Sequence, residues 1–509
     1  MTDDDAAAGP DYSAIATGLP GFVERFGLWS GQQAEAARRV ASEVTAAGLE
    51  AVRVGFADPH GLVRSKTLTP KVFAAALRNG MDFGLGSFMF DTGHDLVIDP
   101  FRPGGGIGVT ELEGASDFIA VPDPLTFRVL PWADKTGWVL CDEYFKTGQP
   151  VPLSPRAALK KQLKRAADRG YAYLVGLEVE WYLTRLVDDP LEFEQVGTFG
   201  SPGAAPKVRP VDAGYQFNSE SWGDASEQFV AVLRRAIRDV GLPLRTTEHE
   251  SGPGQLEFTF DPLPALAAAD AMVLFRSLAK QIAARHGYHA SFMCKPALAG
   301  CDASGWHLHQ SLFDAAAETN LFTSGDPRAI VSPLARAFAG GIIRHAAEAC
   351  LFTTPTVNGY RRFESGHSLA PSVAGWSADN RGAMIRVLGD AFDPSTHLEN
   401  RIGEPSANPY LYMAAQLICG LDGIDNELDP GGMSIDPHAA DGPALPASLQ
   451  AATTAAAGSS LLSEQFGDQL LTLMTALKAN EWERFSKAPE SPLVNGVSGW
   501  EQREYFRAY

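Results

Sequence analysis

Alternation of apolar and polar residues predicts the most informative strand of the chain. In the stretch LVGLEVEWYL, the apolar residues Leu177, Val179 and Trp181 fall on one face of an extended strand. Glu178 and Glu180 fall on the opposite face, about 7 Å apart by the rise per residue. Long helices are predicted over residues 263–286 and 463–487. Strand-like segments and long helices in no regular succession indicate an α+β fold.

The first 145 residues are predicted to form a small domain. Residues 31–47 have a helical pattern, and residues 51–69 contain two strand-like runs around a D-P-H-G turn. A link rich in Gly, Pro and Ser then precedes a helix that Ser154 caps and Pro155 begins. We therefore divide the chain into a disordered tail (1–20), an N-terminal domain (21–145) and a larger domain (146–509).

Composition and charge exclude several classes of protein. The 509 residues are 45% apolar and 20% charged, which is enough to bury a large core. The net charge of -19 repels polyphosphate backbones, so nucleic acid is not an expected partner. The five cysteines are scattered, with no CxxC pair, which fits a reducing compartment. With an acidic start and no run of about 20 apolar residues, we expect a cytoplasmic protein without a membrane association.

Three further segments present acids or histidines from apolar surroundings. TTEHESGPGQLEFTF carries Glu250 and Glu257 on two strands around a turn. The same period of two groups further polar residues in SGWHLHQSLF and HLENRIGEP, namely His307, His309, Ser311, Glu399 and Arg401. Any one of these segments alone could be surface decoration. Together they suggest a bound cation, because clustered carboxylates repel one another unless a positive charge lies among them.

The residue types favour a particular metal and chemistry. Carboxylate oxygens with a single imidazole suit Mg²⁺ or Mn²⁺ better than zinc or copper. Two such ions clamp phosphate oxygens and offset the charge that develops in phosphoryl transfer. Basic partners follow in VNGYRRF and NRGAMIRV, where guanidinium groups can bind carboxylate or phosphate in pairs of hydrogen bonds, namely Arg361, Arg362, Arg381 and Arg386.

The order of these motifs resembles that of bacterial type I glutamine synthetases. The shared patterns, which span almost everything after residue 50, are E-x-E, E-x-G-P-G-Q-x-E, S-G-x-H-x-H-x-S, N-x-Y-x-R, N-R-x-x-x-x-R, L-E-x-R and A-N-P-Y-L. The resemblance implies a small N-terminal β-grasp domain, followed by a large catalytic domain whose antiparallel β-sheet forms a funnel surrounded by helices. It also implies a homo-oligomer, a dodecamer of two hexameric rings, with active sites between subunits.

The resemblance also assigns roles to individual residues. It implies metal ligands at Glu178, Glu180, Glu250, Glu257, His307 and Glu399. It implies ATP contacts at His309, Ser311, Arg381 and Arg386, and catalytic roles for Glu250, Arg362, Arg381 and Arg401. Substrate contacts are implied at Arg362, Arg401, Ala303, Gly305, Trp306, Tyr215 and Leu369. The implied reaction transfers the γ-phosphate of ATP to the side-chain carboxylate of L-glutamate, and a nitrogen nucleophile then displaces the phosphate.

Two departures from the family pattern concern the nitrogen substrate. Members that use ammonia carry an Asp in an F-D-G-S-S loop, where this chain has Gly84, and a Glu in a flap P-G-x-E-A-P. The flap matches residues 365–371 here, so that Ser368 or Leu369 stands in place of the Glu. Loss of both carboxylates makes room and removes attraction for a small cation. The pattern is the one expected of γ-glutamylamide synthetases, which use an organic amine.

The character of the amine and of the acid is less constrained. Phe83 and Phe88, beside Gly84, either pack within the small domain or form an apolar wall around a hydrophobic or aromatic amine. The loop Asp302–Gly305 departs from the N-G-S-G of the family, so the acid is not fixed as glutamate. Two alternatives stay open: a glutamine synthetase that uses ammonia, and a non-catalytic ring-forming structural or regulatory relative.

Overall fold

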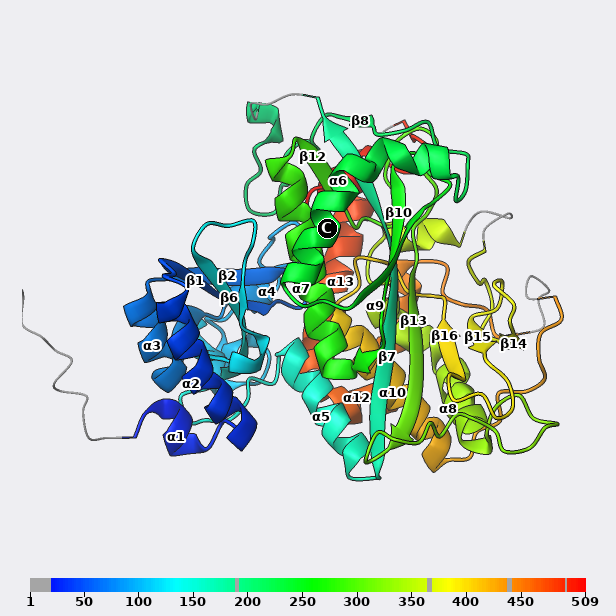
Figure 1. Cartoon of the computed structure of the whole chain (residues 1–509), viewed down its shortest axis with the longest axis horizontal. Helices are drawn as coiled ribbons and strands as arrows, with labels where there is room; N and C mark the ends of the chain where they lie inside the picture. The colour runs from blue at the N-terminus through cyan, green and yellow to red at the C-terminus, as the bar shows by residue number, and fades with distance from the viewer. Residues whose placement is uncertain (1–19, 188–191, 364–368, 437–441, 490–491) are drawn as a thin grey trace, which may run out of the picture.

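Two β-sheets with separate hydrophobic cores organise the chain (Figure 1). The structure is a computed structural model that describes residues 20–187, 192–363, 369–436, 442–489 and 492–509. The predicted tail, apart from residue 20, and residues 365–368 of the predicted flap lie outside the described residues. Among the helices of the described ranges, none combines the length and apolarity that a membrane crossing requires.

The N-terminal sheet has the strand order β2-β1-β6-β4-β3, with β5 paired to β6. Its central strands β1 and β6 run parallel, and its other neighbours run antiparallel. The strands are β1 (Ala51–Ala57), β2 (Val63–Leu68), β3 (Met81–Gly84), β4 (Asp117–Pro122), β5 (Arg128–Val129) and β6 (Thr136–Tyr144). The accompanying helices are α1 (Phe22–Phe26), α2 (Gly31–Ala46), α3 (Pro70–Asn79) and α4 (Gly86–Met89). The assignment of this unit as a β-grasp domain stays a prediction.

The second sheet follows the order β14-β15-β16-β13-β7-β10-β9, and three short strands also pair with β7. All its pairs are antiparallel except β14 with β15. The long strands are β7 (Tyr171–Leu186), β9 (Leu244–His249), β10 (Gln255–Phe260) and β13 (Trp306–Asp314). The others are β8 (Val208–Pro210), β11 (Leu263–Pro264), β12 (Tyr288–Ser291), β14 (Trp376–Ala378), β15 (Ile385–Leu388) and β16 (His397–Asn400).

Helices cover the apolar face of this sheet and form the larger core. Trp181 of β7 packs against Phe275 of a long helix, and Trp306 of β13 packs against Tyr412 of another. In Figure 1 these helices, α7 and α10, lie beside β7 and β13. The helices of this part are α5 (Pro155–Ala167), α6 (Glu220–Asp239), α7 (Ala265–Arg285), α8 (Pro333–Arg344), α9 (Ala346–Thr353), α10 (Pro409–Asp425), α11 (Leu449–Ala457), α12 (Ser460–Phe466), α13 (Asp468–Ser486) and α14 (Gly499–Tyr505). The other face of the sheet is therefore left for polar side chains.

The N-terminal unit is joined to the larger unit by buried contacts. Strand β6 is buried on both faces, with Val139 in the N-terminal core and Leu140 in the larger core. Beside it, the guanidinium group of Arg156 on α5 binds three carboxylates, those of Asp123, Asp142 and Asp270, at 2.8, 2.5 and 2.8 Å. Since Arg156 is 3% exposed, these ion pairs are largely shielded from water and fix the two units together.

Most predicted elements are confirmed. The helix over 31–47, the hairpin around D-P-H-G and the helix after Ser154 are α2, β1–β2 and α5, and the Ser154 side chain accepts a hydrogen bond from the backbone N–H of Ala157. The prediction of one helix over 463–487 is wrong, because α12 ends at Phe466 and α13 begins at Asp468. Gly467 separates them with a φ of +94°, a left-handed conformation that interrupts a helix.

Candidate active site

Strand register brings the predicted glutamates into one group. Glu180 on β7 lies opposite Glu257 on β10, and Glu257 lies opposite Glu248 on β9. Glu178, two residues before Glu180 on β7, lies opposite His307 on β13. Because side chains alternate along a strand, all these polar groups share the face that the helices do not cover.

A second row of side chains crosses the sheet beside the first. His309 on β13 lies opposite Glu399 on β16, which lies opposite Arg386 on β15. On the other side of β13, His309 lies opposite Gly176, where an added Cβ would come within 3.2 Å of the His309 Cβ. Glycine at this position therefore leaves the space that the imidazole occupies.

Glu178 lies at the centre of the cluster. One of its carboxylate oxygens, Oε1, is 2.6 Å from His307 Nδ1, and the other, Oε2, is 3.0 Å from His309 Nε2. Two sets of three side chains could each hold an ion. In each set, every side chain offers one possible ligand atom, and these three atoms lie within 4.8 Å of one another. The first set is Glu178, Glu257 and His307, and the second is Glu178, His309 and Glu399. The predicted ligands on β7, β10, β13 and β16 thus converge.

Burial and neighbouring carboxylates shift the pKa values of the acids in the cluster. Burial and the carboxylates of Glu178 and Glu180 raise the pKa of Glu257 to about 10. Burial and Glu180 likewise raise the pKa of Glu250 to about 8. The pKa of Glu178 shifts in the opposite direction. Burial alone would raise the pKa of Glu178, but hydrogen bonds from His307 and His309 hold it well below its usual range.

This donor set fits divalent cations that prefer oxygen ligands. Glutamate oxygens predominate, a single imidazole joins each set, and the ligand atoms lie close enough for one ion to contact them together. The raised pKa values of Glu250 and Glu257 mean that ionising all the acids requires a nearby positive charge. Glu178 belongs to both sets, so it could bridge two ions.

A cavity of about 420 Å³ opens on one side of this cluster. His309 and Ser311, the predicted ATP contacts, line it beside Glu178. Apolar side chains complete much of its wall, namely Leu174, Leu177, Phe260, Pro262, Phe313, Leu388 and Pro394. An apolar cavity of this volume that ends at a carboxylate cluster can hold a flat heterocycle with its phosphates directed at the metal ligands.

A loop on the other side of the cluster is held by hydrogen bonds to Glu180. The backbone N–H of Gly305 and the side-chain amide of Gln255 donate to Glu180 Oε2 at 3.0 and 3.1 Å. A Cβ on Gly305 would lie 2.7 Å from both Arg362 Nη2 and His307 Nε2, so only glycine allows these groups to approach. Arg362 is buried and donates to the carbonyl oxygens of residues 401 and 403. The predicted contacts Gly305 and Arg362 therefore lie together, next to His307.

The remaining predicted arginines occupy different environments. Arg386 donates to Glu399 Oε2 at 3.0 Å, and Arg401 also binds Glu399. Burial alone would raise the pKa of Glu399, but the nearby His307 and Arg401 lower it below its usual value. Arg381 is exposed, in the turn between β14 and β15. Two of the three arginines thus converge on a predicted metal ligand.

Three predicted substrate contacts are contradicted by their burial. Phe83 and Phe88 pack with Phe56 and Phe118 in the N-terminal core, where they are 7% and 0% exposed. Trp306 is 0% exposed and packs in the larger core. It lies one residue from His307 on the same strand, so alternation directs its side chain to the helical face. These aromatic rings support the fold and do not form the wall of an amine pocket.

Other predicted contacts are accessible. Leu369 is 58% exposed and Tyr215 is 72% exposed, and Ala303 lies in the loop before β13. Gly84, at the end of β3, is exposed, and a Cβ there would meet only Asp117 Oδ1, at 3.9 Å. The position at which ammonia-using members carry Asp therefore has room for a side chain.

Glu248 and His397 also lie at the site, although neither residue was predicted from the sequence. Glu248 lies on β9 two residues before Glu250, which follows the end of the strand, and it lines both the cavity next to Glu178 and a second one. His397 Nε2 lies 2.9 Å from His309 Nδ1 and two residues before Glu399 on the same strand. In both cases, the period of two that identified the neighbouring glutamate could have found the residue.

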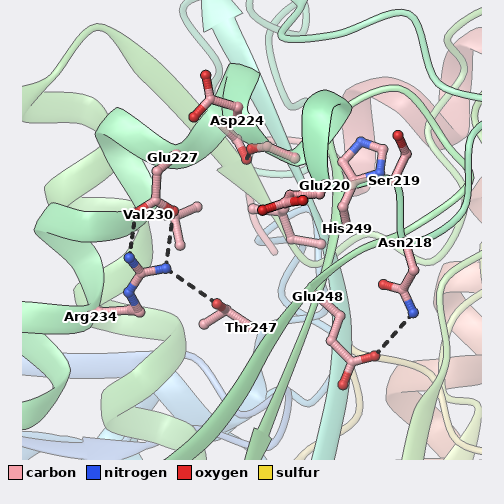
Figure 2. Close-up of a pocket in the computed structure, with 13 residues that line it drawn as sticks. Asn218, Ser219, Glu220, Asp224, Glu227, Val230, Arg234, Thr247, Glu248 and His249 are labelled. Carbon is pink, nitrogen blue, oxygen red and sulfur yellow. Dashed lines mark hydrogen bonds and ion pairs between the residues drawn. The ribbon is translucent and has the colours of Figure 1, made fainter.

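The second cavity, also about 420 Å³, lies between β9 and the start of α6 (Figure 2). Acids dominate its lining, namely Glu220, Asp224, Glu227 and Glu248. Figure 2 shows Arg234 directed at Glu227 and Thr247, and Asn218 directed at Glu248. Glu248 thus lies between an acidic cavity and the cavity that adjoins the glutamate–histidine cluster.

Known proteins match the chain over most of its length. The family described as "Glutamine synthetase, catalytic domain" matches residues 152–494. A γ-glutamylanilide synthase from an Acinetobacter species is 44% identical over 493 residues, which are 95% of this chain and 98% of that protein. A glutamate–isopropylamine ligase from a Pseudomonas species is 32% identical over 384 residues, covering 75% and 79% of the two chains. Among solved structures, a GmaS/ADP complex matches with a TM-score of 0.74 and 30% identity, covering 91% of this chain and 98% of that one.

Proposed function

The chain belongs to the glutamine synthetase family, and on that premise we propose that it is an ATP-dependent ligase that makes a γ-glutamylamide. Its substrates are L-glutamate, ATP and an organic primary amine of hydrophobic or aromatic character. Its products are the amide, ADP and phosphate. The observation that carries the proposal is the glutamate–histidine cluster between an apolar cavity and the Gly305–Arg362 loop region.

The choice of an organic amine rests on two positions. Ammonium is a small cation, and its capture requires carboxylates near the reacting carbon. Gly84 offers no side chain, and Leu369 offers an apolar one. The names of two relatives, a γ-glutamylanilide synthase and a glutamate–isopropylamine ligase, support an organic amine as the nitrogen substrate of this chain.

The two sides of the cluster receive different substrates. His309 and Ser311 orient the nucleotide in the cavity next to Glu178. Arg362, with the loop at Ala303 and Gly305, holds the carboxylate of the amino acid on the other side. Two Mg²⁺ or Mn²⁺ ions, held by Glu178, Glu180, Glu250, Glu257, His307 and Glu399, would clamp phosphate oxygens and offset their charge.

The reaction proceeds in two displacements. An oxygen of the glutamate γ-carboxylate attacks the γ-phosphorus of ATP, the bond to ADP breaks, and a γ-glutamyl phosphate forms. The amine nitrogen then attacks the carbonyl carbon, the carbon–oxygen bond to phosphate breaks, and the nitrogen loses a proton. Arg386 and Arg401, which both bind Glu399, are placed to stabilise the charge on the transferring phosphoryl group.

A phosphate-release assay with a panel of amines tests this proposal. The protein is given glutamate, ATP and Mg²⁺ or Mn²⁺ with aniline, isopropylamine, ethanolamine or ammonium, and each product is identified by its mass. We expect amide formation with an organic amine to exceed glutamine formation. Preferred use of ammonium would identify a glutamine synthetase, and no metal-dependent ATP turnover would identify a non-catalytic relative.

Assembly and compartment are further parts of the proposal. We infer a dodecamer of two hexameric rings with active sites between subunits, and a division into an N-terminal domain (21–145) and a catalytic domain (146–509). Light scattering of the purified protein measures the assembly, and a mass near that of one chain would contradict it. All five cysteines are buried and free, which supports a cytoplasmic location.

A further inference from the structure

Successive residues on the polar face of β7 lie in different parts of the site. Leu174 lines the cavity assigned to the nucleotide, Glu178 and Glu180 lie beside His307 in the glutamate–histidine cluster, and Tyr182 ends the series. By the rise per residue, Leu174 and Tyr182 are about 26 Å apart. The hydroxyl of Tyr182 donates to the backbone oxygen of Asp302 at 2.9 Å, so this end of β7 meets the loop assigned to the acid substrate.

A third segment joins the same end of the site. Ser251, which directly follows Glu250, donates from its hydroxyl to Asp302 Oδ2 at 2.8 Å. The backbone oxygen of Ser251 accepts a hydrogen bond from the backbone N–H of Tyr215 at 2.6 Å. Tyr215 is therefore fixed beside Glu250 and the loop that begins at Asp302, at the end of the site away from the nucleotide cavity.

Tyr215 and Trp222 form an aromatic pair at this place. Their ring centroids are 4.9 Å apart with an interplanar angle of 75°, an edge-to-face contact. Tyr215 is 72% exposed, Phe217 is 62% exposed, and Trp222 is half-buried in the first turns of α6. Large aromatic rings that remain accessible next to a reaction centre offer both apolar area and further edges or faces to a ring-shaped ligand.

The backbone of the segment that carries Tyr215 has an unusual conformation. Tyr215 and Asn218 have φ values of +61° and +50°, in the left-handed region that residues other than glycine rarely adopt. Two backbone hydrogen bonds fix them: Tyr215 donates to Ser251, and Asn218 donates to the carbonyl oxygen of His249. Strained residues that their surroundings hold in place are common at ligand sites.

We propose that Trp222, paired with Tyr215, is the residue that selects an aryl group on the amine. This inference rests on the proposed function. An arylamine reaches the site uncharged, so its ring can pack against the Tyr215–Trp222 pair, with its nitrogen toward the side of Glu250 where the acyl phosphate forms. A simple alkylamine arrives as a cation, and the aromatic pair gives it no comparable ring contact.

Replacing the indole tests the proposal. Trp222→Ala should lower kcat/KM for aniline about tenfold, the effect of losing one aromatic contact, and leave kcat/KM for isopropylamine within about twofold. KM for ATP should not change, because the cavity assigned to the nucleotide lies at the other end of β7. Trp222→Phe should recover most of the aniline activity, since it retains an aromatic ring. Phe101→Ala, which removes another exposed ring from the N-terminal unit, is the matched control.

Several outcomes would overturn this role of Trp222. One is an equal loss with aniline and isopropylamine, and another is no loss with either. A third is a Trp222→Ala protein whose mass in light scattering has changed, since the indole would then support assembly. A wild-type protein that prefers isopropylamine to aniline would contradict aryl selection and leave the proposed function intact. A wild-type protein that makes no amide with any amine would contradict the proposed function itself.

Discussion

Glu180 on β7 and Glu257 on β10 lie directly opposite each other on one face of the large sheet. Two carboxylates in this arrangement destabilise a strand pair unless one is protonated or a cation lies between them. The raised pKa of Glu257, about 10 as a result of burial and its acidic neighbours, corresponds to the first case. Divalent cations would provide the second, so binding of metal and release of protons should be linked.

The first prediction concerns this linkage. The pKa values of Glu250 and Glu257, about 8 and about 10, both lie above the ordinary value of 4.5. At pH 7 both groups hold protons, and Mn²⁺ must displace up to two of them. Titration calorimetry in two buffers of different ionisation enthalpy should show one to two protons released per site at pH 7 and fewer at pH 9. Heats that do not depend on the buffer would contradict this.

The same pKa values fix how stability depends on pH. Above pH 4.5 the metal-free native state holds protons on Glu250 and Glu257 that the unfolded chain has lost. The contribution of these two groups to the free energy of unfolding therefore decreases as pH rises from about 4.5 towards 8 and 10. Saturating Mn²⁺ should reverse this trend, which thermal unfolding over pH 6–9 would measure.

The second prediction concerns removal of one carboxylate. Glu257→Gln should lower metal-dependent ATP turnover more than about a hundredfold. Substituting a residue that only hydrogen-bonds to a metal ligand already lowers metal affinity or activity about 10- to 100-fold. The free energy of unfolding of the metal-free protein at pH 7 should not decrease, because the amide, like the protonated carboxyl group of Glu257, carries no charge beside Glu178 and Glu180. Glu111→Gln, on the exposed surface of the N-terminal unit, is the control. A Glu257→Gln protein with normal turnover would rule out a metal role for this residue.

The third prediction concerns the nitrogen substrate. Gly84→Asp together with Leu369→Glu should raise kcat/KM for ammonium about tenfold or more, since a positioned carboxylate can attract the cation and accept its proton. Neither position obstructs the new side chain: Gly84 has open space, and Leu369 is 58% exposed. Gly84→Asn with Leu369→Gln adds the same volume without charge and should give no increase. An equal effect of both double variants would contradict a role for charge.

The fourth prediction concerns the junction of the two units. Arg156→Ala leaves the carboxylates of Asp123, Asp142 and Asp270 without their shared partner. We expect the free energy of unfolding to fall by about 3–5 kcal/mol, as for other buried ion pairs that lose one member. Arg39→Ala removes an exposed pair with Glu35 and should cost less than about 1 kcal/mol. Denaturant unfolding measures both, and equal losses would show that the junction is not a buried ion-pair site.

Local pattern was sufficient to predict much of the site. Alternation along β7 and β13 placed Glu178, Glu180, His307 and His309 on polar faces, and the structure brings Glu178, His307 and His309 within hydrogen-bond distance. The same pattern also identifies Trp306 as a core residue. Trp306 was predicted to contact substrate because it precedes His307 in the sequence. Adjacent residues of a strand point to opposite faces, so its side chain lies on the face opposite to that of His307.

Other features depend on contacts that local sequence does not encode. That Glu248 faces Glu257 follows from the register of β9 with β10, which the turn between them sets. The burial of Phe83 and Phe88 follows from their packing with Phe56 and Phe118, which are distant in the sequence. The ion pairs of Arg156 join residues up to 114 positions apart. Long-range packing of this kind is fixed only by the assembled fold.

Transfer of ¹⁸O distinguishes phosphorylation of the glutamate γ-carboxylate from simple hydrolysis of ATP. The protein is given glutamate labelled with ¹⁸O in both oxygens of its γ-carboxylate, together with ATP, Mg²⁺ and aniline, and the released phosphate and the amide are analysed by mass. If Glu178 and its neighbours support transfer of phosphate from ATP to the γ-carboxylate, each phosphate should carry one ¹⁸O and each γ-glutamylanilide should retain one. Unlabelled phosphate, with both ¹⁸O atoms left on glutamate, would contradict the formation of a γ-glutamyl phosphate.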